Sequence, residues 1–146
     1  MAVSVPQPRI FSVREAAATL PLVGRVVGDL LEAYPRWKSL VARYEVLTTP
    51  LKATDGEPQE VLALREAAAR EAGRINDFLL ELEEVGCVFK GFDAGLVDFY
   101  ALRDDRLVFL CWRMGEPRIT HWHEIDSGFA GRQPIDSIML AETVIG

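Results

Sequence analysis

The sequence predicts an α+β fold in which a long antiparallel helical hairpin precedes a small antiparallel β-meander. Apolar residues recur at alternating steps of three and four as far as Gly86, which is the period of a helix face. After Gly86 they recur at steps of two, which is the period of a strand. With 146 residues the chain has the length of one domain. We divide it into a helical part at 12–86, a meander at 87–126 and a C-terminal loop or tail at 127–146.

The helical part begins with a capping box. The Ser12 hydroxyl can cap a helix, and Glu15 stands where its carboxylate can return to the Ser12 backbone. Pro21 follows soon after, so we predict one short helix at 13–20 and a second helix with Pro21 in its first turn, where a missing N–H costs little. The apolar seam of the second helix consists of Val23, Val26, Leu30, Ala33, Trp37, Leu40, Tyr44 and Leu47.

A second seam follows a turn-rich segment at 48–58, in which Asp55-Gly56 lies between two prolines. The members of this seam are Val61, Leu64, Ala68, Glu71, Ile75, Phe78, Leu82 and Val85. Glu71 is its one polar member, and Gly86 then supplies a natural C-cap. Two long helices joined by a short loop form an antiparallel hairpin.

The first long helix carries more apolar surface than one partner helix can cover. Its second stripe consists of Leu22, Val27, Leu31, Tyr34 and Val41. A helix that is apolar over so wide an arc needs a second neighbour. We therefore predict a homodimer in which two copies of this helix meet and form a four-helix bundle.

The meander is predicted from four short segments with strand character. CVFKGF at 87–92 is followed by LVDFYALR and RLVFLCWR, which flank Asp104-Asp105 and predict a hairpin, and RITHWHEI predicts a fourth strand. A two-residue turn at the aspartate pair places Arg103 opposite Arg106. One face of the hairpin is then wholly apolar, with Val97, Phe99, Ala101, Val108, Leu110 and Trp112. We expect this face to pack on the helices.

Asp98 lies on the other face of the hairpin, opposite Cys111 in this register. A carboxylate buried without a partner is costly. Arg113 lies diagonally across, within reach of a long side chain. We predict a structural ion pair between Asp98 and Arg113, and the alternative is a carboxylate that serves a binding site.

The composition of the chain argues against two classes of binding partner, nucleic acids and membranes. The formal net charge is −6, so phosphate backbones repel the chain, and we expect no nucleic-acid partner. The sequence has no run of 18 apolar residues, so we expect no membrane partner, and no signal-like N-terminal segment. Its cysteines, Cys87 and Cys111, lie in apolar runs and do not form a disulfide framework. We therefore expect a cytoplasmic protein.

The segment THWHEI suggests a metal site. On a strand His121 and His123 point to the same face, and paired imidazoles can bind Zn²⁺ or a similar ion when a third ligand is present. Glu116, Asp98 or Glu124 could supply that third ligand as a carboxylate, although Glu124 points to the opposite face of the strand. The alternative is a half-buried strand with structural histidines. In that case His123 is the more buried of the two, and its loss destabilises the protein more than the loss of His121.

The loop from Gly128 to Arg132 suggests an anion site. Its backbone N–H groups could surround a small anion, with the Arg132 guanidinium as a bidentate fork. Arg113 and Asp98 are further candidates for ligand binding. The alternative is a turn in which the glycines supply positive φ and Arg132 pairs with an acid.

Three segments of the chain resemble a known family. They are FSVREAAATLPLV near the start, GLVDFYALRDDRLVFLCWRMGEP in the middle and WHEIDSGFAGRQP near the end. Together they resemble the bacterial domain of unknown function 2203, over nearly the whole chain. The resemblance implies neither an activity nor catalytic residues. It includes the histidine that follows tryptophan, here His123, whereas His121 is an addition of this sequence.

No Ser/His/Asp order, P-loop or CxxC motif is present, and polar residues are scattered along the chain. A thiolate pair of Cys111 and His123 is an alternative, but Cys111 lies between Leu110 and Trp112, where a thiol is expected to be inert. Our leading hypothesis is therefore a dimeric interaction or structural protein of the cytoplasm. The alternatives are a small metal-dependent, hydrolase-like enzyme that uses the histidine pair, and a binder of small anions.

Overall fold

The computed structural model describes residues 8–141 and confirms the α+β class. Two long helices, α1 (Val13–Thr48) and α2 (Gln59–Val85), form an antiparallel hairpin. A sheet follows with β1 (Val88–Gly91), β2 (Leu96–Arg103), β3 (Arg106–Arg113), β4 (His121–Glu124) and β5 (Gln133–Pro134). The strands lie in sequence order and all neighbours are antiparallel. A 3₁₀ turn, η1 (Phe129–Gly131), and a short helix, α3 (Ser137–Ala141), complete the chain.

Helix α1 is one continuous helix, so the predicted break at Pro21 is wrong. Its start is as predicted, because Ser12 and Glu15 form the capping box. A proline inside a helix costs about 3 kcal/mol through the missing hydrogen bond and a steric clash. Buried side chains before and after Pro21, among them Ala16 and Val23, hold both sides of the helix on the core. We attribute the continuity to this packing, which outweighs the local cost.

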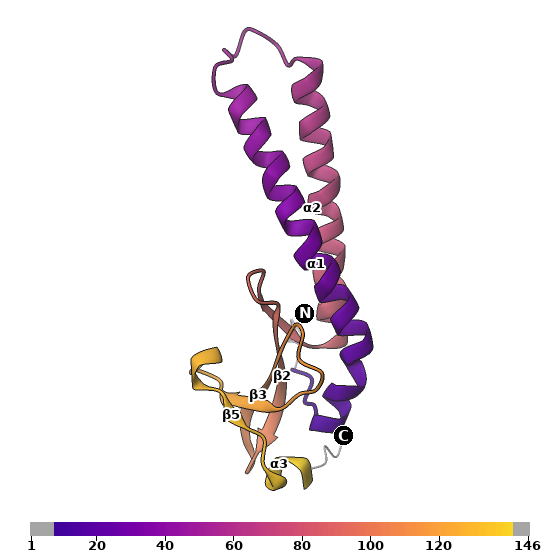
Figure 1. Ribbon diagram of the computed structural model, residues 1–146, viewed down its shortest axis with the longest axis vertical. Coiled ribbons are helices and arrows are strands. Elements are labelled where there is room, and N and C mark those ends of the chain that lie inside the picture. Colours follow the sequence, from indigo (N-terminus) through magenta and orange to yellow (C-terminus); the bar gives the residue numbers. More distant parts are fainter. Residues whose placement is uncertain (1–7, 142–146) are drawn as a thin grey trace, which may run out of the picture.

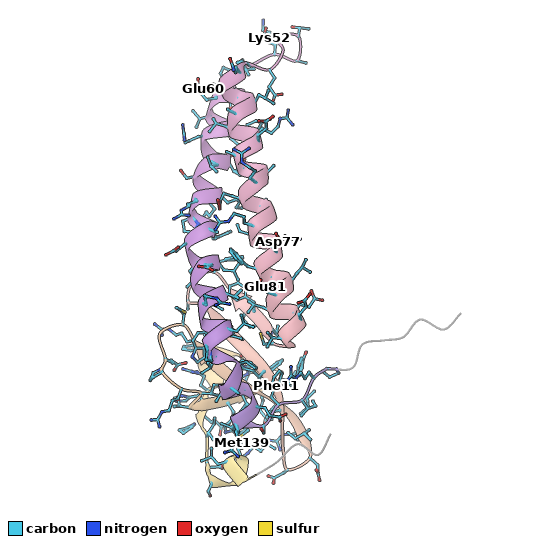
Figure 2. The ribbon with its side chains drawn as sticks, turned by 90° about the vertical axis from the view of Figure 1, so that its right-hand side faces the viewer. Phe11, Lys52, Glu60, Asp77, Glu81 and Met139 are labelled. Atoms are coloured by element: carbon cyan, nitrogen blue, oxygen red, sulfur yellow. The ribbon has the colours of Figure 1, made fainter. Side chains whose placement is uncertain are left out.

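The sheet lies beside the end of the hairpin at which α1 begins and α2 ends, and the rest of the hairpin extends beyond the sheet (Figure 1). Figure 2 shows Lys52 at the far tip of the hairpin and Phe11 and Met139 at the sheet end. The core is built where the two parts meet. It includes Val23, Val26, Val27 and Leu30 of α1, Leu82 of α2, and Val97, Phe99, Val108 and Leu110 of the sheet.

The register predicted for the central hairpin is confirmed. Arg103 pairs with Arg106 and Asp98 pairs with Cys111. Asp104 and Asp105 both have positive φ, 50° and 60°, as a two-residue turn of this kind requires. The six apolar residues of one face are all buried against the helices. The opposite face of the hairpin is therefore turned away from the helices, and it carries Asp98 and Cys111.

The segment predicted as a C-terminal loop or tail contains more structure than expected. It holds η1, the edge strand β5 and α3, whereas residues 142–146 lie outside the described residues. A two-residue strand is too short to produce a period of two, which is why the sequence pattern did not reveal it. Pro134 is tolerated there because an edge strand has backbone N–H groups that need no partner in the sheet.

The second apolar stripe of α1 is partly covered within the chain. A Cβ placed on Gly95, in the β1–β2 connection, would lie 3.0 Å from a methyl group of Val27 and 3.1 Å from one of Leu31. Tyr34 stacks on Phe92 of the same connection, with ring centroids 4.1 Å apart. The β1–β2 connection therefore covers much of this stripe and takes the place of a second neighbouring helix.

The homodimer stays a prediction. Of the stripe residues, Leu22 is 39% exposed and remains for a partner to cover. Light scattering at micromolar concentration measures the mass in solution, and twice the chain mass of 16.3 kDa is the expected result. A mass of one chain would contradict the dimer and would agree with the cover supplied by the β1–β2 connection.

Candidate functional site

Three polar side chains meet on the sheet face that is turned away from the helices. Asp98 comes from β2, Cys111 from β3 and His123 from β4, so each of three adjacent strands contributes one residue. One ligand atom from each lies within 4.8 Å of the other two. All three residues are buried, with Asp98 and His123 only 3% and 2% exposed. We call these residues the Asp-Cys-His cluster.

His123 is held by a hydrogen bond at each ring nitrogen. Its Nδ1 lies 2.7 Å from the carbonyl oxygen of Glu124, and its Nε2 lies 3.1 Å from Oδ1 of Asp98. A carbonyl oxygen can only accept, so Nδ1 carries a proton and donates it. The contact between Nε2 and the carboxyl group also needs a proton between its two atoms. Asp98 and His123 therefore share one proton, and the buried pair has no net charge whichever atom holds it.

Cys111 is a thiol rather than a thiolate in this arrangement. Burial and, to a smaller extent, the neighbouring Asp98 carboxylate raise the pKa of Cys111 to about 12, although Arg132 acts in the opposite direction. A nucleophilic cysteine needs a lowered pKa. In a Cys/His/Asp triad the aspartate orients the imidazole from the nitrogen remote from the thiol. Here Asp98 occupies Nε2 and a backbone carbonyl occupies Nδ1, so the cluster does not have the geometry of that triad.

Arg132 connects the cluster to the turn after β3. Its Nη2 donates to the carbonyl oxygen of Cys111 at 3.1 Å and to Oε1 of Glu116 at 2.8 Å. Burial disfavours the charged form of Glu116, but hydrogen bonds from Arg132 and from the Arg113 backbone outweigh this and lower the pKa of Glu116. The guanidinium also lies 4.8 Å from the ring centroid of Phe129. Arg132 thus fixes the backbone at Cys111 and places a positive charge near its sulfur.

The other residues that the sequence predicted for a site do not join the Asp-Cys-His cluster. The predicted ion pair between Asp98 and Arg113 is wrong, because Asp98 pairs with His123 and Arg113 is exposed. The Nδ1 of His121 lies 2.8 Å from the Thr120 hydroxyl, outside the Asp-Cys-His cluster. Glu116 pairs with Arg132.

A pocket of about 240 Å³ opens on the cluster. Its lining consists of Lys90, Leu96, Asp98, Cys111, His123, Ile125, Gly128 and Phe129. The cluster thus has access to a small ligand even though its side chains are buried. Gly128, which begins the loop that we predicted as an anion site, borders this pocket with a φ of 65°.

Comparison with known proteins identifies a family without an assigned activity. The model of the family described as "Uncharacterized conserved protein (DUF2203)" matches residues 9–135 and confirms the resemblance seen in the sequence. No curated protein and no solved structure matches the chain. Among residues 8–141, no helix is both long and apolar enough to span a membrane.

Proposed function

The chain belongs to the DUF2203 family, and we propose that it binds one divalent metal ion of the zinc class at Asp98, Cys111 and His123. The observation that carries this proposal is the convergence of a carboxylate oxygen, a sulfur and an imidazole nitrogen within 4.8 Å. Around a tetrahedral zinc ion such atoms lie about 3.3–3.5 Å apart. Side-chain rotations that move each ligand atom by about an ångström therefore suffice to bring the three atoms around one ion.

The surroundings of His123 support the proposal. An imidazole that binds a metal through one nitrogen usually donates its other N–H to a carboxylate or carbonyl group. The Nδ1–H of His123 already donates to the carbonyl oxygen of Glu124, which leaves Nε2 directed at the cluster. A mixed sulfur, nitrogen and oxygen set favours Zn²⁺ or Co²⁺ over Mg²⁺ and Ca²⁺, which prefer oxygen ligands alone.

Charge balance also supports a divalent ion. In the metal-free cluster the shared proton neutralises Asp98 and His123, and Cys111 is a neutral thiol. A bound ion would replace the shared proton and the thiol proton, so two positive charges leave as one ion with two charges enters. The net charge of this buried site stays at zero, which avoids the large cost of burying an unbalanced charge. Arg132, beside the sulfur, stabilises the thiolate that the ion requires.

Three protein ligands leave a fourth tetrahedral position open, which is the arrangement of catalytic rather than purely structural zinc sites. Here that position would be directed at the pocket. A water molecule bound to such an ion is acidified and becomes a nucleophile near neutral pH. Metal-assisted hydrolysis of a small substrate is therefore the reaction class that we propose for this site.

Substitution of the two histidines by glutamine tests the metal site. We expect about one Zn²⁺ or Co²⁺ per chain in the native protein and in the His121→Gln variant. In the His123→Gln variant we expect the affinity to fall by more than about 100-fold, because loss of a ligand should exceed the 10–100-fold effect of losing a residue that merely orients one. Elemental analysis of untagged protein measures the metal content. Titration with Co²⁺, monitored through the sulfur-to-metal absorption band, measures the affinity.

The same variants separate the metal site from its alternatives. Equal loss of the ion in both variants would favour the histidine pair and contradict the Asp-Cys-His cluster. If the native protein binds no ion while His123→Gln lowers the melting temperature, the cluster is a structural ion pair. Asp98→Asn and Cys111→Ser, which keep the size of each side chain, should weaken Co²⁺ binding without changing the circular dichroism spectrum.

A further inference from the structure

The pocket above the Asp-Cys-His cluster combines apolar walls with the side chain of Lys90 in its lining. Leu96, Ile125 and Phe129 line it with hydrocarbon, and the latter two are 45% and 41% exposed. Such walls suit the body of a small organic molecule, since burial of each methylene group contributes about 0.8 kcal/mol. The volume of about 240 Å³ lies below the usual range of ligand pockets and limits the ligand to a few carbon atoms.

Lys90 is the cation that this pocket presents. Its ammonium lies 5.1 Å from the ring centroid of Phe109, a neighbour of the cluster on β3, whose ring is in turn 5.4 Å from that of His123. No carboxylate within residues 8–141 forms an ion pair with Lys90. Arg132, in contrast, already pairs with Glu116. The positive charge available to a ligand therefore comes from Lys90.

We infer that the pocket binds a small organic anion, such as a short branched carboxylate, with its anionic head on the open metal position beside Lys90 and its hydrocarbon body against Leu96 and Phe129. The inference rests on the proposed metal site. With an ion bound, Asp98 and Cys111 balance both metal charges, so an anionic head finds its opposite charge at Lys90. This assigns the anion to the pocket rather than to the Arg132 guanidinium, where the sequence placed it.

Titration of the Co²⁺-loaded protein with isobutyrate tests this inference. The visible absorption of Co²⁺ reports a change of ligand at the open position. We expect isobutyrate to bind more tightly than acetate, by about fourfold for each additional buried carbon atom. Isobutyramide, which has the same shape without the charge, should bind weakly. In the Phe129→Ala variant the preference for isobutyrate over acetate should decrease.

Two lysine variants provide a matched pair. Lys90→Met should weaken isobutyrate binding about two- to fivefold, the effect of a partly exposed ion pair. Lys38→Met is the control, because the Lys38 ammonium also lies over an aromatic ring, that of Tyr34 at 5.5 Å, but on the hairpin. It should leave isobutyrate binding unchanged.

The outcomes separate this inference from the metal site. A native protein that takes up no Co²⁺ overturns the metal site and the anion pocket together. A Co²⁺ spectrum that isobutyrate does not change overturns the anion pocket and leaves the metal site intact. Equal affinity for acetate and isobutyrate, unaffected by Lys90→Met, would mean that anions reach the metal without using the pocket, and would also overturn the inference.

Discussion

Replacement of Trp112 by alanine should destabilise the protein by about 3–5 kcal/mol, the cost of truncating a buried aromatic side chain. Trp112 lies on the apolar face of the β2–β3 hairpin, opposite Val97, and is only 4% exposed. A Cβ placed on Gly24 of α1 would lie 3.9 Å from its ring. Trp112 therefore fills the space between sheet and helix, and alanine would leave a cavity there. Most single domains have a free energy of unfolding of 5–15 kcal/mol, so much of it would be lost.

Thermal denaturation followed by circular dichroism measures this loss, and we expect the melting temperature to fall by roughly 10–20 °C. Trp37→Ala is the matched control. Trp37 is only partly buried, and its main aromatic neighbour is Tyr34, 5.9 Å away between centroids. Its loss should cost about 1–2 kcal/mol. A Trp112→Ala variant that melts within a few degrees of the native protein would show that this face does not pack on α1.

The Trp112 indole N–H also donates a hydrogen bond to the carbonyl oxygen of Glu116, at 2.9 Å. The tryptophan thus connects the core to the turn that carries Glu116, and through Glu116 to Arg132 beside the cluster. Trp112→Phe retains most of the apolar volume and removes this bond. Its expected cost is about 1–2 kcal/mol, from one lost hydrogen bond and a small cavity.

The sequence determined the central hairpin because two local signals agree there. The period of two sets which residues share a face, and the Asp104-Asp105 turn sets which residues are opposite each other. Pro21 shows where local signals fail, because the helix continues through it for reasons of tertiary packing that the local pattern does not contain. The edge strand β5 was missed for a related reason, since two residues carry no periodicity.

The candidate site could be predicted only in part. Asp98 was recognised as a costly buried carboxylate, and His123 as the more buried histidine, which the structure confirms. The predicted partner of Asp98 was wrong because only the register between β2 and β3 could be derived from the sequence. Residues 114–120 separate β3 from β4, and a connection of that length does not fix which residue of β4 lies beside Cys111. The contact between His123 and Asp98 therefore becomes visible only in the folded structure.

Metal affinity should rise by at least about tenfold for each pH unit between about pH 6 and pH 8. The pKa of Cys111 is raised to about 12, so the metal-free protein keeps the thiol proton throughout this range. The ion must displace this proton, because it binds the thiolate. Protons compete with the ion, so raising the pH removes the competitor and increases affinity, and each released proton contributes tenfold per unit.

Competition for Co²⁺ with a chromophoric chelator, at three pH values and corrected for protonation of the chelator, measures this slope. The Cys111→Ser variant is the control, because it removes the thiol proton, so the slope should become smaller while weaker binding remains. Cys87 should contribute nothing: its pKa is also raised, to about 11 by burial, but it lies outside the cluster. Affinity that does not change with pH would mean that Cys111 does not give up its proton, and the ion would then bind elsewhere.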